Sequence, residues 1–153
     1  QNSLIFAGRK INESIPKTIA DKIKRLVPNK NSKIFVMGFA FKGEPETDDI
    51  RNSSTLDLVE NLISEHTIYG HDPVVSSETL KGLNVKPVSL EEGFKDADCV
   101  IIMNNHMKYR DLDILKLLKN SSQPCIFIDT WRLFDRKIFE KNESIIYSGI
   151  GIV

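Results

Sequence analysis

The sequence has little of what marks several common protein classes. Its only two cysteines, Cys99 and Cys125, each lie inside an apolar run. This pattern excludes a disulfide-stapled scaffold and favours a reducing compartment. No apolar stretch approaches the roughly 20 residues that a membrane-spanning helix needs, and no signal-peptide pattern is present. We therefore expect a cytoplasmic protein without a membrane partner.

The sequence also has no excess of positive or of negative charge. Lysine plus arginine and aspartate plus glutamate each total 21, so the formal net charge of the 153 residues is zero. Nucleic-acid-binding domains are usually basic, so we expect no nucleic-acid partner. Hydrophobic residues make up 41% and charged residues 27%, values that argue against disorder. The length suits one domain, and a chain that starts at Gln1 is expected to be a piece of a longer protein.

The first 27 residues have the pattern of an amphipathic helix. Ser14 is a plausible N-cap, with Pro16 in the first turn, and Pro28 marks the end of the helix. The apolar stripe must pack against its own domain, serve as a linker or contact a second subunit. Its isoleucines recur at every fourth position: Ile11, Ile15, Ile19 and Ile23.

From Lys33 onward, apolar strand patterns alternate with helical patterns. Strands are predicted over residues 33–38, 67–71, 84–87, 99–103, 124–129 and 144–147, and helices from 54 and over 76–80, 90–94 and 112–118. Such alternation indicates βαβ units with right-handed crossovers. We predict an α/β domain of three layers, Rossmann-like and doubly wound, with a mostly parallel sheet preceded by the amphipathic helix.

In such a sheet, ligands bind at the carboxyl ends of the strands, near the point where strand order reverses. This rule selects three loops, 38–54, 71–75 and 129–135. The first loop lacks the G-x-G-x-x-G fingerprint, and Glu44 stands where a P-loop would place lysine. We therefore do not expect this domain to hold NAD by itself. Asp72 falls where a ribose-binding acid would stand, but an Asp-Pro turn explains it as well.

Loop 38–54 combines cationic side chains with a helix start. An anion there would meet free backbone N–H groups and the positive end of the helix dipole, and Lys42 and Arg51 could add charge. The alternative is that Lys42 is solvated and that Arg51 only pairs with Asp48 or Asp49. The loop's acidic residues are more typical of a solvated surface than of a metal site, so no metal is expected.

The third loop contains Trp131 and Arg132. A base could stack on Trp131, or a phosphate could pair with Arg132; alternatively, Trp131 and Phe134 only cover the sheet edge. No serine or cysteine has a nucleophile motif around it. The residues therefore predict a binding loop and no catalytic residue.

The loop after the first predicted strand contains two specific segments, Gly38-Phe39-Ala40-Phe41-Lys42 and Thr47-Asp48-Asp49-Ile50-Arg51-Asn52-Ser53. They resemble the G-x-A-F-K…T-D-D-x-R-x-S signature of the UDP-glucose/GDP-mannose dehydrogenase family. Others are similar in the same order: 9–16 to its R-x-I-N-x-x-x-P stretch, 69–73 to its Y-D-P turn, Ala97-Asp98 with His106 to its A-D…x-x-H segment, and 129–132 to its D-x-R element.

The resemblance implies an NAD-dependent nucleotide-sugar 6-dehydrogenase, which oxidises the C6 alcohol of a UDP-sugar to the uronic acid. Residues 1–29 would be the end of the central, dimer-forming helical region and residues 30–153 the C-terminal UDP-binding domain. The NAD-binding domain and the catalytic cysteine would lie upstream, so this piece alone is expected to be inactive. A homodimer or higher homo-oligomer is implied for the whole enzyme, and the resemblance does not select the sugar or decide between UDP and GDP.

By position in the family motif, Phe41 and Lys42 would contact the nucleotide-sugar, and Arg51 would reach toward the NAD pyrophosphate. The arginine of the D-x-R element would contact the substrate, but Trp131 stands at that position and Arg132 follows one residue later. We assign Arg132 to the substrate, with its role open between Trp131 and Arg132. The alternative to the whole assignment is a stand-alone nucleotide-binding or regulatory module without redox activity.

Overall fold

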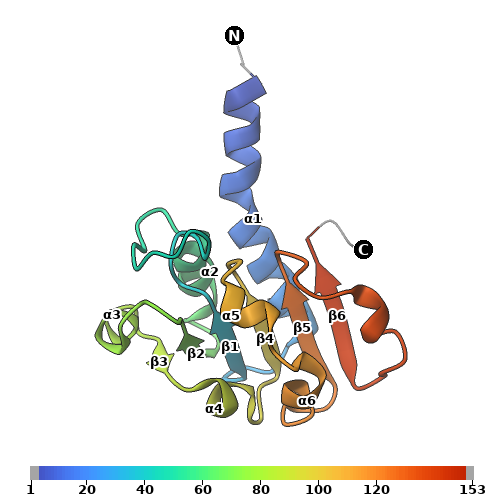
Figure 1. The fold of residues 1–153 in the computed structure, drawn as a ribbon. Helices are drawn as coiled ribbons and strands as arrows, with labels where there is room; N and C mark the ends of the chain where they lie inside the picture. Colours follow the sequence, from blue (N-terminus) through green and yellow to red (C-terminus); the bar gives the residue numbers. More distant parts are fainter. Residues whose placement is uncertain (1–3, 151–153) are drawn as a thin grey trace.

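The computed structural model describes residues 4–150, which form one six-stranded sheet with helices on both faces (Figure 1). The strands are β1 (Lys33–Met37), β2 (Thr67–His71), β3 (Lys86–Pro87), β4 (Cys99–Ile102), β5 (Cys125–Asp129) and β6 (Ile145–Gly149). Their order is β3-β2-β1-β4-β5-β6, and every pairing is parallel. Strand order therefore reverses between β1 and β4, which confirms the predicted doubly wound, Rossmann-like α/β class.

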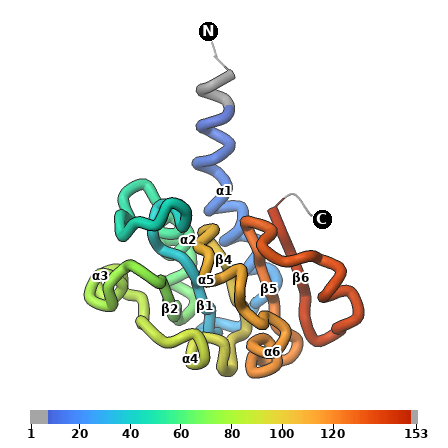
Figure 2. The backbone as a smooth tube through the Cα atoms, viewed as in Figure 1, coloured from blue at the N-terminus to red at the C-terminus, as the bar shows by residue number. Residues whose placement is uncertain are grey.

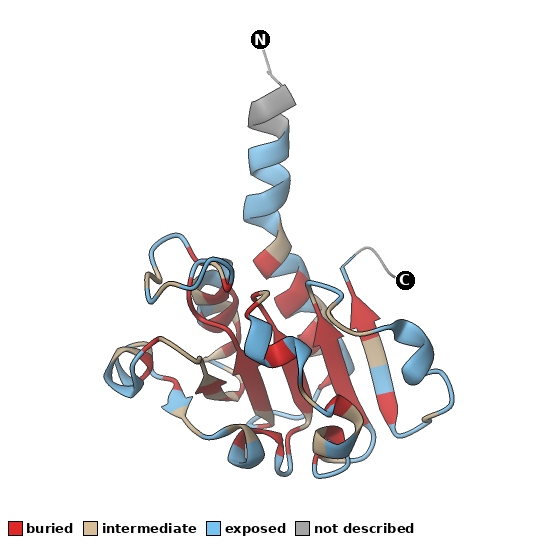
Figure 3. Cartoon of the chain, viewed as in Figure 1, coloured by how far each residue is buried: buried red, intermediate tan, exposed pale blue. Residues whose placement is uncertain are grey.

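Alternate residues of the central strands face opposite layers, as the period of two requires. Ile34 and Val36 of β1 belong to one apolar cluster, while Phe35 and Met37 belong to the other. The central strands β1, β4 and β5 are thus buried on both faces, and Figure 3 colours them mostly as buried. The first cluster lies under α1 (Leu4–Leu26), α2 (Ser54–Leu62) and α3 (Ser77–Gly82), and the second under α4 (Leu90–Phe94), α5 (Met107–Arg110), α6 (Ile114–Leu118) and the 3₁₀ helix η1 (Arg136–Ile138).

Helix α1 begins well before the predicted N-cap, so that prediction is wrong. Ser14 lies inside the helix and its hydroxyl donates to the carbonyl of Ile11 at 2.7 Å. Pro16 is likewise interior, where it removes one helical hydrogen bond, but its ring is buried. Burial of an apolar ring offsets part of that loss. Helix-capping patterns in the sequence do not reveal such tertiary burial.

The two halves of α1 have different surroundings. Ile19 and Ile23 in its second half are buried in the core, whereas Ile11 is 63% exposed. Figure 2 shows the second half behind β4 and β5, whereas the blue turns that precede it stand clear of the domain. Within residues 4–150, no helix combines the length and apolar character that a membrane crossing requires.

The other predicted elements are confirmed with small shifts at their ends. Two short elements, α5 and η1, were not predicted. Each has only three or four residues, too few for a helical period to be visible. Helix α5 follows β4 directly and therefore lies at the edge of the sheet where strand order reverses.

Candidate functional site

A cavity of about 640 Å³ opens at the carboxyl ends of β1, β4 and β5. Figure 1 shows the arrowheads of β5 and β6 pointing toward the end of the domain from which α1 projects. The cavity wall combines aromatic, aliphatic, amide, hydroxyl, cationic and acidic side chains from α1, the β1–α2 loop, the ends of β4 and β5 and the residue after β6. Its lining residues are Asn12, Ile15, Ile19, Phe41, Lys42, Glu44, Asn52, Ser54, Met103, Asn105, Thr130, Trp131 and Ile150.

The start of the β1–α2 loop is fixed by Asp72 at the end of β2. One carboxylate oxygen of Asp72 accepts the backbone N–H groups of Phe39 and Ala40, at 2.7 and 3.0 Å. The other accepts those of Val74 and Val75, at 2.9 and 3.0 Å. Both oxygens are engaged by main chain, so Asp72 is explained as a turn-forming and loop-bracing residue, not as a ribose-binding acid.

The ring of His71, which precedes Asp72, is also engaged inside the protein. The Tyr109 hydroxyl donates to the carbonyl oxygen of His71 at 2.9 Å and lies 3.1 Å from its ring Nδ1. Because that hydroxyl hydrogen is already donated, the ring Nδ1 is the donor of the second bond. Burial lowers the pKa of His71, which favours the neutral form of the ring. Loop 71–75 thus braces the site and does not line the cavity.

Two hydrogen bonds, Gly43 to Asn105 and His106 to Glu46, join the middle of the β1–α2 loop to the segment after β4. We call this pair of contacts the clasp. The N–H of Gly43 donates to the side-chain oxygen of Asn105 at 3.1 Å. A Cβ at position 43 would lie 2.1 Å from the backbone nitrogen of His106, so only glycine permits this approach. The ring Nε2 of His106 lies 2.8 Å from a carboxylate oxygen of Glu46. Its Nδ1 accepts the N–H of Lys108, so Nε2 carries the hydrogen and donates to Glu46.

Phe41 and Lys42 are presented to the cavity by this fixed loop. The N–H of Phe41 donates to the carbonyl of Asp49 at 2.7 Å, which closes the loop on itself, and its ring is 56% exposed. Lys42 lines the same cavity, and no residue of 4–150 forms an ion pair with it. Of the three residues that the family resemblance assigns to the substrate, Phe41 and Lys42 line the cavity and Arg132 does not.

The N-terminus of α2 forms another part of the wall. Ser53 is the N-cap and its hydroxyl accepts the N–H of Thr55 at 3.3 Å, while Thr55 donates to the carbonyl of Gly38 at 2.8 Å. Asn52, in the left-handed region with φ of 60°, and Ser54 line the cavity beside this helix start. Lys42 and the positive end of α2 thus border one space that suits an anion.

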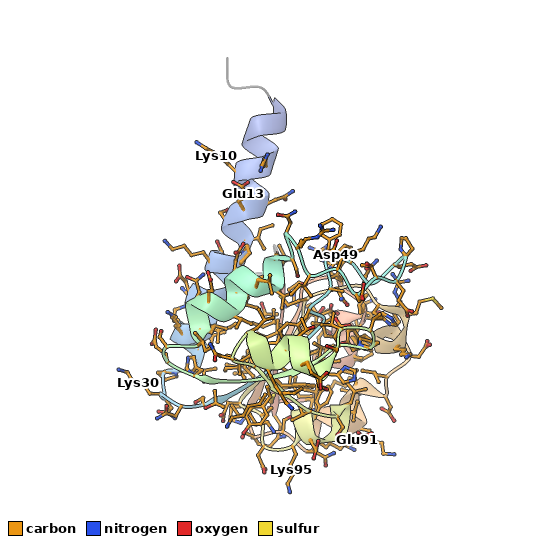
Figure 4. The ribbon with its side chains drawn as sticks, turned by 90° about the vertical axis from the view of Figure 1, so that its left-hand side faces the viewer. Lys10, Glu13, Lys30, Asp49, Glu91 and Lys95 are labelled. Atoms are coloured by element: carbon orange, nitrogen blue, oxygen red, sulfur yellow. The ribbon has the colours of Figure 1, made fainter. Side chains whose placement is uncertain are left out.

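Arg51 lies on the surface and outside the cavity lining. Its guanidinium forms a two-pronged ion pair with Asp49, with Nε–Oδ1 at 2.9 Å and Nη2–Oδ2 at 2.7 Å. Hydrogen bonds from Arg51 lower the pKa of the Asp49 carboxyl to about 2. Figure 4 shows Asp49 at the end of the domain nearest the projecting part of α1, while Lys30, Glu91 and Lys95 lie toward the opposite end. The pairing considered as an alternative for Arg51 is present.

Trp131 and Arg132 point to different surroundings. The Trp131 ring is 49% exposed, lines the cavity and donates its indole N–H to the carbonyl of Met103 at 3.0 Å. Arg132 has a φ of 51° and donates to the carbonyl of Ile150 at 3.0 Å. Ile150 lines the cavity, so Arg132 lies at its edge and not among the lining residues.

The two cysteines are unsuited to nucleophilic chemistry. Both are fully buried in strands, and burial raises the pKa of the Cys99 thiol well above its ordinary value and that of Cys125 to about 11. Residues 4–150 also contain no cluster of three histidine, cysteine, aspartate or glutamate side chains that could hold a metal ion.

Sequence reasoning did not select Asn105 and His106 as site residues. They follow β4, and only the strand order places β4 beside β1. The predicted loops followed the first, second and fifth strands. In doubly wound sheets of the Rossmann type the first and fourth strands are neighbours, and this general rule was the signal that could have added the loop. Asn12 and Ile15 of α1 could not be placed, because nothing local indicates where a preceding helix docks.

The parallel order with one reversal, and a cavity at that reversal, define a doubly wound α/β domain of the Rossmann-like class. The chain belongs to the UDP-glucose/GDP-mannose dehydrogenase family: the model of that family's UDP binding domain matches residues 35–136. This match covers more than half of the chain and confirms the resemblance seen in the motifs.

Individual relatives agree with this assignment. The chain is 27% identical over 146 residues to a UDP-N-acetyl-D-mannosamine dehydrogenase of Methanocaldococcus jannaschii, covering 94% of this chain and 33% of the relative. It is 31% identical over 121 residues to a Campylobacter jejuni enzyme of the same name, covering 75% and 29%. The chain thus spans about a third of these curated relatives.

Among solved structures, an NDP-N-acetyl-D-galactosaminuronic acid dehydrogenase from Methanosarcina mazei Go1 shares the fold. It superposes with a TM-score of 0.80 at 24% identity, covering 99% of this chain and 32% of that structure. At this identity the likeness concerns the fold alone.

Proposed function

We propose that this chain is the substrate-nucleotide-binding part of an NAD-dependent nucleotide-sugar 6-dehydrogenase, and that the cavity binds the UDP portion of a UDP-sugar. The observation that carries the proposal is the position of Lys42. This cation has no ion-pair partner within residues 4–150 and lies on the cavity that also contains the start of α2. Phe41 and Lys42 are the proposed substrate contacts.

The physical chemistry of a nucleoside diphosphate suits this wall. The diphosphate carries concentrated negative charge, which Lys42 and the positive end of the α2 dipole can neutralise. The base and ribose are flatter and less polar, and the exposed ring of Phe41 with the aliphatic side chains of Ile15 and Met103 offers them apolar contact. The two curated relatives described above are named for UDP-sugars, which makes UDP the first nucleotide to test.

In the proposed reaction, NAD oxidises the C6 alcohol of the bound sugar to the uronic acid. The residues of this chain do not fit NAD in the Rossmann manner. Loop 38–54 lacks the glycine fingerprint, and the Asp72 carboxylate that would meet a ribose is engaged by four backbone N–H groups. NAD is therefore assigned mainly to a domain outside these residues, and no catalytic residue is assigned within them.

The remaining proposals concern residues outside the cavity lining, the two segments of the chain and the whole enzyme. Arg51, exposed beside the α2 start, is the proposed contact with the NAD pyrophosphate across a domain cleft, and Arg132 is a proposed substrate contact at the cavity edge. Residues 1–29 would belong to the central helical region of the enzyme and residues 30–153 to its UDP-binding domain. The whole enzyme would be cytoplasmic and a homodimer or higher homo-oligomer. The alternative function is a stand-alone nucleotide-binding or regulatory module.

Calorimetric titration of the 153-residue chain with UDP, GDP and NAD tests the proposal. We expect saturable binding of UDP, weaker binding of NAD, and no NADH production from any UDP-sugar by this chain alone. Tighter binding of NAD than of UDP would contradict the assignment of the cavity. Turnover by the purified chain would contradict the assignment of catalysis to residues outside it. UDP binding by a full-length protein that lacks dehydrogenase activity would favour the alternative, a stand-alone nucleotide-binding or regulatory module.

A further inference from the structure

Trp131 is an unusual feature of the cavity. Large apolar side chains exposed singly need no explanation, but the Trp131 and Phe41 rings, 49% and 56% exposed, line the same cavity from two different loops. By contrast, Phe35, Phe94 and Phe127 elsewhere in the chain are fully buried. Two half-exposed aromatic rings at one cavity indicate a ligand with an apolar, flat component.

The orientation of the indole is set before any ligand arrives. Its N–H donates to the carbonyl of Met103 at 3.0 Å, which ties it to the end of β4. The backbone of the same loop is held by the fully buried Asp129 carboxylate, which accepts the N–H groups of Trp131 and Phe134 at 3.3 and 3.0 Å. A ring fixed in this way loses little conformational entropy on binding a ligand.

The same loop directs the side chain of the next residue, Arg132, away from the cavity. The left-handed backbone of Arg132, with φ of 51°, directs its guanidinium to the carbonyl of Ile150. Position 131 therefore faces the cavity and position 132 faces its rim. An indole cannot neutralise a phosphate as an arginine can, but it can stack on a planar ring.

We propose that Trp131 is a stacking surface for the base of the nucleotide bound in this cavity, while Lys42 serves the diphosphate. The inference rests on the proposed function, since it assigns one contact within the same site. Stacking on an aromatic side chain adds affinity for any base because every base has a π-face. Trp131 thus contributes to nucleotide affinity and does not select uracil over guanine.

The sequence offers a direct probe, because Trp131 is the only tryptophan of the chain. We expect UDP to change the intrinsic fluorescence of the 153-residue chain saturably, and inorganic pyrophosphate at saturation to change it far less. By calorimetry, Trp131→Ala should bind UDP about 5- to 100-fold more weakly and pyrophosphate as wild type does. Trp131→Phe should retain most of the UDP affinity.

The outcomes separate this inference from the function on which it rests. If wild type shows no UDP binding by calorimetry, the proposed function fails and the stacking contact fails with it. If wild type binds UDP, but its fluorescence does not respond and Trp131→Ala binds UDP equally well, only the stacking contact is wrong. Should Trp131→Ala not fold, the wild-type fluorescence comparison of UDP with pyrophosphate and the Trp131→Phe affinity decide the question.

Discussion

The carboxyl ends of β1 and β2 lie side by side and both carry polar side chains, yet they serve different purposes. At the end of β2, both oxygens of Asp72 accept backbone N–H groups. In the loop after β1, Lys42 lines a cavity and forms no ion pair within residues 4–150. A polar residue at the ligand-binding edge is thus a candidate contact only when its bonding capacity is not already used by the fold.

The two regions also depend on each other. The N–H groups of Phe39 and Ala40, which Asp72 accepts, directly precede the cavity residues Phe41 and Lys42. The end of β2 therefore holds the loop that presents the binding groups. This relation predicts that changes at β2 alter stability, and that changes at the β1 loop tip alter binding.

The largest expected effect comes from Asp72→Ala. Four backbone N–H groups lose a charged acceptor, and we expect the free energy of unfolding to fall by about 3–5 kcal/mol. Denaturant unfolding followed by circular dichroism measures this change. Asp72→Asn, which keeps one oxygen acceptor, should be intermediate. A variant with wild-type stability that had lost nucleotide binding would instead support a ribose-binding role for Asp72.

Lys42→Ala should have the opposite profile. We expect UDP affinity to fall by about 1.5–3 kcal/mol, the range for a hydrogen bond to a charged group, with little change in unfolding free energy. The matched control is Lys95→Ala, an exposed lysine at the opposite end of the domain (Figure 4). Calorimetry with UDP compares the two, and equal affinities of both variants would remove Lys42 from the site.

The contrast also explains how far the sequence could predict this molecule. Strand positions and the Rossmann-like class follow from apolar periodicity, which is local. The cavity depends on contacts between residues far apart in the chain, such as Gly43 with Asn105 and Glu46 with His106. No local pattern encodes these pairs, so the loop after β4 was not selected.

The different settings of Trp131 and Arg132 show the same limit at finer scale. The sequence placed both residues in one loop at the carboxyl end of a strand but left open which of them lines the cavity there. That choice depends on the backbone at Arg132 and on the bond from the indole to Met103, which belongs to a neighbouring strand end. The α1 residues of the cavity were likewise beyond prediction, because helix docking is a tertiary property.

Glu46→Ala tests whether the clasp between the β1–α2 loop and the segment after β4 contributes to the free energy of unfolding, to UDP affinity or to both. The buried Nε2–H of His106 loses its acceptor, and we expect a loss of about 1–2 kcal/mol in unfolding free energy. Because the clasp positions the loop that carries Lys42, UDP affinity should also fall, by less than in Lys42→Ala. Asp48→Ala, an exposed acidic residue of the same loop, is the control. If both variants match wild type in stability, the clasp does not hold the loop.

The smallest effect is expected at Arg51, whose ion pair with Asp49 is solvent-exposed and therefore of little consequence for stability. The pKa of Asp49 is lowered from 3.8 to about 2 by Arg51. Since the folded-state pKa is depressed, the pair's stabilisation is present above pH 3.8 and is lost as pH falls through about 2. Arg51→Ala should return the Asp49 pKa toward 3.8 in an NMR titration of its carboxyl carbon. UDP affinity should remain that of wild type, because Arg51 lies outside the cavity lining. A large loss of UDP affinity in this variant would move Arg51 into the substrate site and blur the distinction between groups bound by the fold and groups left for the ligand.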